Sequence, residues 1–417
     1  MLCHLKEILK IDSNQDVSTK TAISSRLFAD DGCYLLKRDL TDPTEKQFDE
    51  FHFLVKWIAF TINPKDSPIS LKLKKIWHIF LSIICIYTTL YDLYILITQY
   101  NSSHAPHVII YLMIAWQSLF SLFLLVNWQH KLRFESFFHL YHHSKIRDVP
   151  ELDERHLAAV RRTRRQFWGM QLYSVVNMSV YLIAIMTKYI ETIMNPAYAY
   201  SFYFPILRYI RPVLGYMCLL VLTHNMHIYL SITNLLHSEV RKFNYTIKNL
   251  KASTSDEMKS RLESLLCLHT KICGLVTEMD EIYRIYTFMT TICTIPLMIF
   301  ALVISRKTLI EFSFSVSPMT FCAYQLYVIM YPARLHGELN KSKYLLCMNE
   351  KVWIPYDENV HKIGTTLAIH LDQPSVGITL WGFALVTKSL ILTIASVMMT
   401  CLALLLDMRP KDLTHSD

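Results

Sequence analysis

The sequence closes its last apolar stretch with TKSLILTIASVMMTCLALLLDM, residues 387–408. Small or polar residues recur there at steps of three and four, namely Ser389, Thr393, Ser396, Thr400, Ala403 or Leu404, and Asp407. Residues with this spacing lie on one face of a helix. Lipid tails cannot form hydrogen bonds with a row of hydroxyl groups. The pattern therefore predicts a membrane-spanning helix with one face against water or another helix.

Six further apolar segments of similar length precede this one. Of the 417 residues, 52% are hydrophobic and only 18% are charged. A helix needs about 20 apolar residues to cross the hydrocarbon core, and backbone inside lipid satisfies its hydrogen bonds as helix. The predicted fold class is therefore an all-α membrane protein with seven transmembrane helices. They cover residues 76–98, 107–127, 169–190, 212–234, 285–304, 312–332 and 384–407.

The distribution of Lys and Arg predicts the orientation, because these residues accumulate beside spans on the cytoplasmic side. The segments before span one, between spans two and three, between four and five, and between six and seven hold 12, 9, 8 and 5 of them, against six on the opposite side. The amino terminus is therefore expected in the cytosol and the carboxyl terminus outside. This orientation argues against a G-protein-coupled receptor, which has its amino terminus outside.

The parts outside the spans are predicted to build a helical cytosolic base. A short apolar patch, FHFLVKWIAF at 51–60, is too short to span and suits an interfacial or re-entrant helix. The predicted parts are a cytosolic segment 1–75 that includes this patch, spans one to six with long cytosolic helical loops over 76–345, a cytosolic anchor helix 346–383, a pore-lining helix 384–408 and an extracellular tail 409–417.

The loop before span five carries a regular apolar pattern. Its members alternate steps of three and four, which is typical of a helix packed along one seam. They are Leu262, Leu265, His269, Ile272, Val276, Met279 and Tyr283. Since the pattern runs directly into span five, one continuous helix is expected to project from the membrane into the cytosol.

The end of the chain resembles the insect gustatory receptor family. The final helix of that family carries Thr-Tyr, five apolar residues and Gln-Phe, and this chain has Thr400-Cys401, LALLL and Asp407-Met408. Upstream, the family's Gly, Phe and basic residue followed by Ser-Leu match Gly382, Phe383 and Lys388–Leu390. With the predicted span count, orientation and large inner loops, the chain looks like a divergent member.

That resemblance implies a ligand-gated, non-selective cation channel built from four subunits, identical or related, in the plasma membrane. Four copies of the last helix would surround the pore, and the cytosolic helix ends would form most subunit contacts. The hydroxyl stripe would then face water, Ala403 or Leu404 would form an apolar constriction, and Asp407 an acidic ring that concentrates cations. In the alternative interpretation, the small residues pack helices closely and bond to their own backbone.

The resemblance also implies a pocket for a small organic tastant or metabolite in the outer half of the bundle. Aromatic and ionisable residues predicted in that layer are the candidate ligand contacts: Tyr91, Tyr111, Trp116, Tyr181, Lys188, Tyr216 and Phe312. An aromatic belt at the membrane interface is the alternative explanation for about half of the aromatics in this layer. Asp92 is expected either to pair with Lys188 or to leave Lys188 reaching toward the interface.

Other functional classes find less support. The sequence contains no P-loop, dinucleotide fingerprint, zinc-protease helix or serine-nucleophile elbow, so no enzyme activity, metal or cofactor is predicted. The basic balance reflects the inner face of a membrane, so the expected partners are the lipid bilayer, a small-molecule ligand and related subunits, with no nucleic acid. A seven-helix receptor or transporter without its own pore, signalling through partner proteins, remains the alternative.

Overall fold

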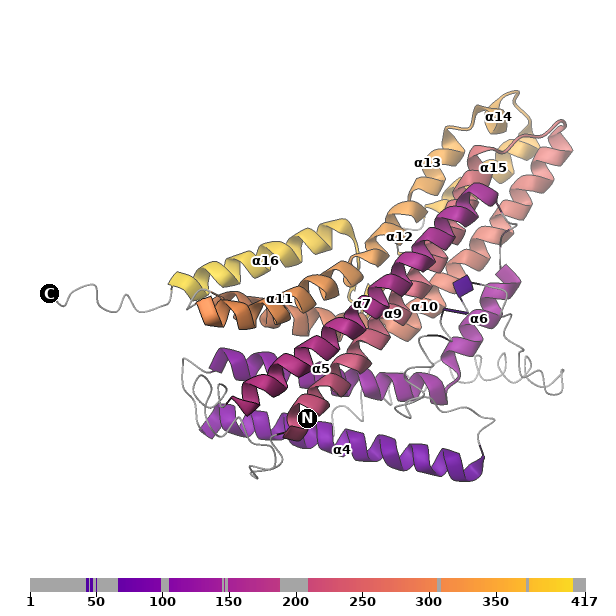
Figure 1. Ribbon diagram of the computed structural model, residues 1–417. Coiled ribbons are helices and arrows are strands. Elements are labelled where there is room, and N and C mark those ends of the chain that lie inside the picture. The colour runs from indigo at the N-terminus through magenta and orange to yellow at the C-terminus, as the bar shows by residue number, and fades with distance from the viewer. Residues whose placement is uncertain are drawn as a thin grey trace. The chain divides into compact units, whose positions relative to one another are not determined.

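The computed structural model describes residues 43–44, 46–47, 50, 67–98, 105–144, 146, 149–187, 209–305, 309–372 and 375–407. The predicted interfacial helix at 51–60, Lys188 and the tail 409–417 lie outside these residues. The main elements, shown in Figure 1, are α4 (Pro68–Thr98), α5 (Ala105–His130), α6 (Arg133–Ser144), α7 (Pro150–Met186), α9 (Ile210–Lys248), α10 (Ser255–Ile304), α11 (Leu309–Ile329), α12 (Tyr331–Leu339), α13 (Lys341–Cys347), α14 (Glu350–Trp353), α15 (Glu358–Leu371), β1 (Thr379–Leu380), β2 (Ala384–Leu385) and α16 (Lys388–Asp407).

The described part of the chain is a multi-pass helical membrane protein. Each of the seven predicted spans overlaps a helix, and five of these, α4, α5, α7, α9 and α10, are long and apolar enough to cross a membrane. A shorter apolar helix covers Lys388–Leu404 within α16. The predicted span at 312–332 falls on α11 and the start of α12, which are separated by a turn at Met330.

Helix α9 lies at the centre of the packing. It contacts α5, α7, α10, α11, α12 and α13, and every residue from 219 to 236 is buried. Several of these buried residues are polar, and they find partners on neighbouring helices. Thr223 accepts a hydrogen bond from the Gln171 amide of α7 at 2.9 Å, and the Asn225 amide donates to the Ser121 carbonyl of α5 at 2.9 Å. Polar side chains therefore join α9 to its neighbours where lipid would not solvate them.

Helix α10 confirms the predicted continuous helix. It has 50 residues, which corresponds to about 75 Å at 1.5 Å per residue. All seven residues of the predicted seam are buried. Because the hydrocarbon core is only about 30 Å thick, the helix extends well beyond any single crossing. Its far end packs against α15 and α6, outside the predicted spans.

The segment 346–383 is not the single anchor helix that was expected. It holds the end of α13, the short α14, α15 and part of a β-hairpin, so the described fold is not purely α-helical. Two side-chain caps account for the breaks, because Asn349 accepts from Lys351 N and Asp357 accepts from the backbone N–H groups of Asn359 and Val360. Pro355, which lacks a backbone donor, lies between these two helices.

The predicted last span also begins later than expected, because Ala384–Leu385 form strand β2 and α16 begins only at Lys388. Strands β1 and β2 pair antiparallel around a tight turn in which Trp381 and Gly382 have φ values of 52° and 79°. Two successive positive φ values produce the turn that suits the twist of a hairpin, and glycine adopts such a value without steric cost. The Trp381 N–H donates to the Arg284 carbonyl of α10 at 3.1 Å, so the turn is fixed to that helix.

Candidate functional site: two pockets at one end of the bundle and an outward-facing last helix

Two pockets lie toward the same end of the helical bundle. Their lining residues come from the second halves of α4 and α7 and the first halves of α5 and α9, with α10 and α11 adding to the second pocket. The most basic sequences, LKLKK and RRTRR, lie in the opposite halves of α4 and α7. Since basic residues mark the cytoplasmic side, the pockets lie at the end that is predicted to be outside.

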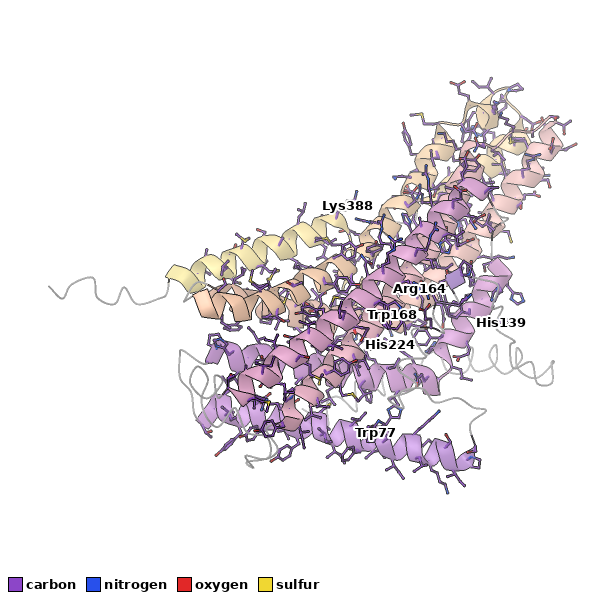
Figure 2. All side chains as sticks on the ribbon, viewed as in Figure 1. Trp77, His139, Arg164, Trp168, His224 and Lys388 are labelled. Carbon is purple, nitrogen blue, oxygen red and sulfur yellow. The ribbon has the colours of Figure 1, made fainter. Side chains whose placement is uncertain are left out.

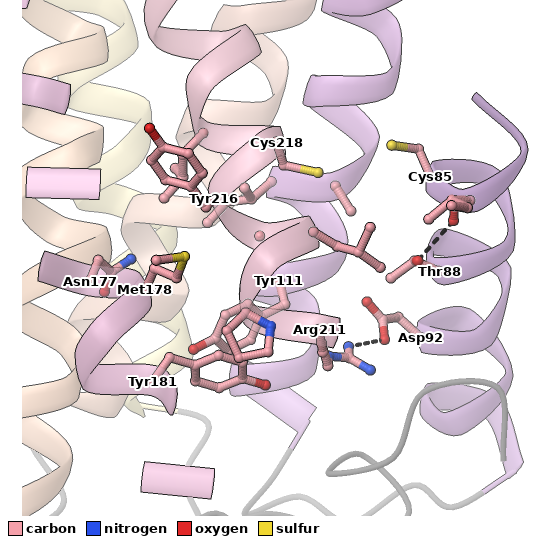
Figure 3. Close-up of a pocket in the computed structure, with 17 residues that line it drawn as sticks. Cys85, Thr88, Asp92, Tyr111, Asn177, Met178, Tyr181, Arg211, Tyr216 and Cys218 are labelled. Carbon is pink, nitrogen blue, oxygen red and sulfur yellow. Dashed lines mark hydrogen bonds and ion pairs between the residues drawn. The ribbon is translucent and has the colours of Figure 1, made fainter. Parts of the chain in front are cut away.

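Pocket 1 is a hollow between α4, α5, α7 and α9 with about 780 Å³ of empty space, including its mouth. Most of its lining is apolar, and the polar side chains are few (Figure 3). The lining residues labelled in the figure are Cys85, Thr88, Asp92, Tyr111, Asn177, Met178, Tyr181, Arg211, Tyr216 and Cys218.

A buried ion pair forms one wall of pocket 1. Asp92 of α4 and Arg211 of α9 are 1% and 6% exposed, and the Arg211 Nη2 donates to the Asp92 Oδ1 (Figure 3). Burying a charge inside a membrane protein costs free energy unless the charge is paired. The ion pair therefore reduces the cost of burying both side chains. Among the described residues, Asp92 thus pairs with Arg211. Lys188, the partner considered for it from the sequence, lies outside these residues.

Pocket 2 shares a wall with pocket 1 and has about 760 Å³ of empty space on the side of α10 and α11. The shared wall includes Tyr111 and Tyr181, whose ring centroids are 5.7 Å apart. A polar cluster lies on the far side, where the Tyr173 hydroxyl donates to the Ser317 carbonyl at 2.6 Å and the Ser317 hydroxyl donates to Asn177 Oδ1 at 3.0 Å. The Tyr111–Tyr181 pair therefore separates two neighbouring hollows.

The structure brings three of the seven predicted ligand contacts to a pocket. Tyr111, Tyr181 and Tyr216 line pocket 1. Tyr91 lies in a small buried cluster against which Tyr111 and Tyr181 pack, and it lines neither pocket. Trp116 is 46% exposed and also lines neither. Lys188 and the side chain of Phe312 lie outside the described part of the chain.

Several residues that line the pockets were not predicted as ligand contacts from the sequence. Cys85, Thr88, Asn177 and Cys218 carry no distinguishing pattern, because single small or polar residues are common in membrane helices. Arg211 did carry a signal, since a basic residue next to a predicted span on the side of Asp92 is a possible partner for that acid. Only the packing of α4 near α9 selects it over other basic residues.

Helix α16 is the second candidate site, and it is only loosely held by the described chain. Among the described elements, α16 packs mainly against α10. Each predicted pore-lining side chain that the structure describes is exposed, namely Ser389, Thr393, Ser396, Thr400, Ala403 and Leu404. The side chain of Asp407, the last residue of α16, lies outside the described set. Figure 2 shows Lys388 at the start of this helix.

The exposed stripe of α16 points away from the face that packs on the chain. The less exposed residues are Leu390, Ile391, Ile394, Met398, Cys401 and Leu402. At about 100° per residue, this packed face and the hydroxyl stripe lie about 150° apart around the helix. Two hydroxyls bond within the helix, because Thr393 donates to the Ser389 carbonyl at 3.1 Å and Thr400 to the Ser396 carbonyl at 3.0 Å. Each threonine oxygen still keeps lone pairs that can accept from water.

The hairpin before α16 is fastened to α10 by one carboxylate. Asp280 accepts from the Thr379 N–H at 2.5 Å and from the Thr379 hydroxyl at 2.9 Å. The aromatic rings of Trp381 and Phe383 lie against Phe288 of the same helix, with centroids 5.0 and 6.2 Å away. The start of α16 is therefore set by α10, the helix that also contributes Ile304 to pocket 2.

The helical base contains a close pair of histidines and an exposed apolar surface. The Nδ1 atoms of His269 on α10 and His370 on α15 are 2.9 Å apart, so one ring donates and the other accepts. Burial and the neighbouring His370 lower the pKa of His269 to about 4. Large apolar side chains of the base are 61–72% exposed in the single chain: Tyr344, Met348, Ile354, Tyr356 and Ile369.

Comparisons with known proteins support the fold. No family model matches the chain, and no curated protein matches it. Among solved structures, it is similar to the insect olfactory receptor OR5 from Machilis hrabei, with a TM-score of 0.69, 11% identity, and coverage of 86% of this chain and 99% of that one. The same receptor in complex with eugenol gives a TM-score of 0.65 at 12% identity, covering 87% and 99%.

The class defined by these observations is a multi-pass helical membrane protein. More particularly, the chain has the fold of an insect olfactory receptor over most of its length. This likeness concerns the fold, and membership of the insect gustatory receptor family stays a prediction from the sequence.

Proposed function

We propose that this chain is a gustatory-receptor-like chemoreceptor, one subunit of a tetrameric cation channel that a small organic molecule opens. It would lie in the plasma membrane with its amino terminus in the cytosol. The observation that carries the proposal is α16, whose hydroxyl stripe faces away from its own chain. A stripe of this kind in a membrane protein suits water or copies of itself.

In the proposed channel, Ser389, Thr393, Ser396 and Thr400 line the pore. Leu404 or Ala403 forms the apolar constriction, and Asp407, one turn further on, provides the acidic ring. The packed face of α16 rests on its own subunit, which leaves the stripe for the central axis. The hydroxyls that bond within the helix reduce the cost of an apolar surrounding in the closed state.

The exposed apolar surface of the base supports the proposed assembly. Its five large side chains lie on or beside α13 and α15, outside the predicted spans, where lipid would not cover them. Contiguous apolar surface on such a region marks a protein interface. A closed ring of four subunits would bury this surface while the four α16 helices meet at the centre.

The proposed ligand site is formed by pockets 1 and 2. A ligand opens the channel only if it binds the open state more tightly than the closed state. Helix α10 is the connection available for this coupling, because it contributes to pocket 2 and holds the hairpin that precedes α16. The eugenol complex of the olfactory receptor supports a small organic molecule as the ligand class.

Cysteine scanning of α16 in expressed channels tests the pore assignment. Ser396→Cys and Thr400→Cys are expected to make ligand-evoked currents sensitive to a charged, water-soluble thiol reagent. Ile394→Cys and Met398→Cys, on the packed face, serve as matched controls, in a background where Cys401 is replaced by serine. Asp407→Asn is expected to lower the preference for cations.

The result that would count against the pore is equal modification of both faces, with unchanged conductance in Asp407→Asn. Counting subunits by single-molecule photobleaching adds a separate measurement. Four bleaching steps agree with the proposal, whereas a monomer with ligand binding but no current would favour a receptor that signals through partner proteins.

A further inference from the structure

Pocket 1 contains an unusual combination for a membrane protein, an apolar hollow with one acid and one base in its wall. Among the described lining residues, Asp92 and Arg211 are the charged ones, so their charges cancel. Both are almost fully buried, and they lie 119 positions apart in the chain, on α4 and α9. A pair at this depth is costly to maintain, which makes it a candidate for a role in ligand recognition.

The pair offers a donor and an acceptor side by side. Only the Oδ1 oxygen of Asp92 takes part in the bond with Arg211, so Oδ2 is the oxygen that can accept from a ligand. The hydroxyl of Tyr181, in the adjoining wall, is buried and interacts with Arg211. Since a hydroxyl can accept from a guanidinium, its own O–H can still donate to a ligand. By contrast, the Thr88 hydroxyl already donates to the Ile84 carbonyl at 2.8 Å (Figure 3).

We infer that pocket 1 selects small, neutral organic molecules that carry a hydroxyl group, and that the Asp92–Arg211 pair excludes their charged analogues. A hydroxyl donates to the carboxylate and accepts from the guanidinium or from Tyr181. An ionic ligand loses its hydration on entry and meets a site in which each charge already has a counter-charge. The inference names the ligand class for the pocket of the proposed receptor and rests on that function, although binding can be measured without it.

Four compounds with one aromatic ring and one attached carbon test this selectivity. They are benzyl alcohol, toluene, benzoate and benzylammonium, which differ in the polar group alone. Binding is measured on the purified full-length chain in lipid nanodiscs, from the concentration dependence of its thermal stabilisation. The wild-type chain is expected to bind benzyl alcohol about tenfold more tightly than toluene, because the hydroxyl bonds to charged partners, and to bind both ions most weakly.

Two variants that each remove one charge test whether the pair recognises the ligand or only stabilises the fold, because only recognition predicts opposite changes in the affinities of the two ions. Asp92→Asn leaves the positive charge of Arg211, so benzoate is expected to gain about tenfold relative to benzylammonium. Arg211→Gln leaves the negative charge of Asp92, so the ranking of the two ions is expected to reverse. Asp92→Glu and Arg211→Lys keep both charges and should keep the wild-type order. Arg164→Gln removes an arginine whose ion pair with Glu50 lies elsewhere, and it is the matched control.

The outcomes separate the two proposals. If the wild-type chain binds toluene as tightly as benzyl alcohol, or prefers either ion, the inference is wrong whether or not the variants fold. It is also wrong if both single-charge variants fold and keep the wild-type order. If the binding order is as expected while benzyl alcohol evokes no current in cells, the selectivity of the pocket stands and the channel proposal fails.

Discussion

Helices α9 and α16 both have long apolar stretches, yet α9 is buried within the chain and α16 is mostly exposed. Residues 219–236 of α9 are buried without exception, and their polar groups bond to neighbouring helices. Most of α16 is exposed, and its polar groups point away from the chain. Polarity alone therefore does not distinguish a packing helix from a pore helix. The distinguishing feature is whether the same chain provides the partner.

The largest contrast is expected from removing an apolar side chain in each helix. Leu222 of α9 is fully buried and Leu392 of α16 is 71% exposed. Leu222→Ala leaves a cavity in a tightly packed region and is expected to lower the free energy of unfolding by about 2–5 kcal/mol. Leu392→Ala leaves no cavity in the single chain and should change it by less than about 0.5 kcal/mol. Thermal inactivation of the purified protein in detergent measures both.

If Leu222→Ala and Leu392→Ala lowered the stability equally, the expected difference between the two helices would be wrong for the single chain. Subunit number must be measured on the same samples, because an assembled tetramer could bury Leu392. If Leu392→Ala lowered the stability of the tetramer but not of the single chain, a partner subunit would be packed against α16.

The next effect concerns the base, where α10 meets α15 through the two histidines. Burial and then His370 lower the pKa of His269 to about 4, so the folded state keeps it neutral while an unfolded chain takes up a proton near pH 6.5. Its stabilising contribution is present above about pH 6.5 and is lost as the pH falls toward about 4, by at most roughly 3 kcal/mol. Melting curves between pH 7.5 and 4.5 measure this loss.

The His269→Gln variant is expected to show a flatter pH dependence than the wild type. His143→Gln, at an exposed position on α6, is the matched control and should follow the wild-type curve. If His269→Gln also follows the wild-type curve, His269 does not contribute to the pH dependence of stability.

A smaller, local effect is expected at the hairpin that fixes the start of α16. Asp280→Asn replaces a carboxylate that accepts two hydrogen bonds from Thr379, and bonds to charged groups contribute about 1.5–3 kcal/mol. Hydrogen exchange at the Thr379 amide is therefore expected to accelerate by about tenfold or more, while α9 stays protected. Glu281→Gln is the control, since the neighbouring carboxylate pairs with Arg133 at 3.5 Å. Equal acceleration in both variants would show that the tether is not specific.

Much of the fold could be predicted from local patterns in the sequence. Apolar length located the helices, and the spacing from Leu262 to Tyr283 located a buried seam because a helix repeats every 3.6 residues. The hairpin was missed because its strands have two residues each, too short for a periodic signal. Gly382 was noticed as a motif residue, but its positive φ is visible only in the backbone.

The candidate site was harder to predict than the fold. Tyr111 and Tyr181 could be selected because aromatic residues are concentrated in the predicted outer layer. The partner of Asp92 could not be selected, because contact between residues 119 positions apart depends on how α4 and α9 are arranged. The sequence could place the hydroxyl stripe on one face of a helix, but only the packing of Leu390, Ile394 and Leu402 indicates which way that face points.

The smallest effect on stability, and the most informative about α16, is expected from Thr400→Val. The substitution keeps the shape of the side chain and removes a hydroxyl that is exposed and bonds to its own helix. The free energy of unfolding should therefore change by less than about 0.5 kcal/mol. Single-channel conductance should nevertheless fall, because an apolar methyl group replaces a group that solvates ions in the proposed pore. Met398→Leu, on the packed face, should alter stability more than conductance. If Thr400→Val instead destabilises the chain and leaves conductance unchanged, the stripe packs against protein, and α16 is a second buried helix like α9.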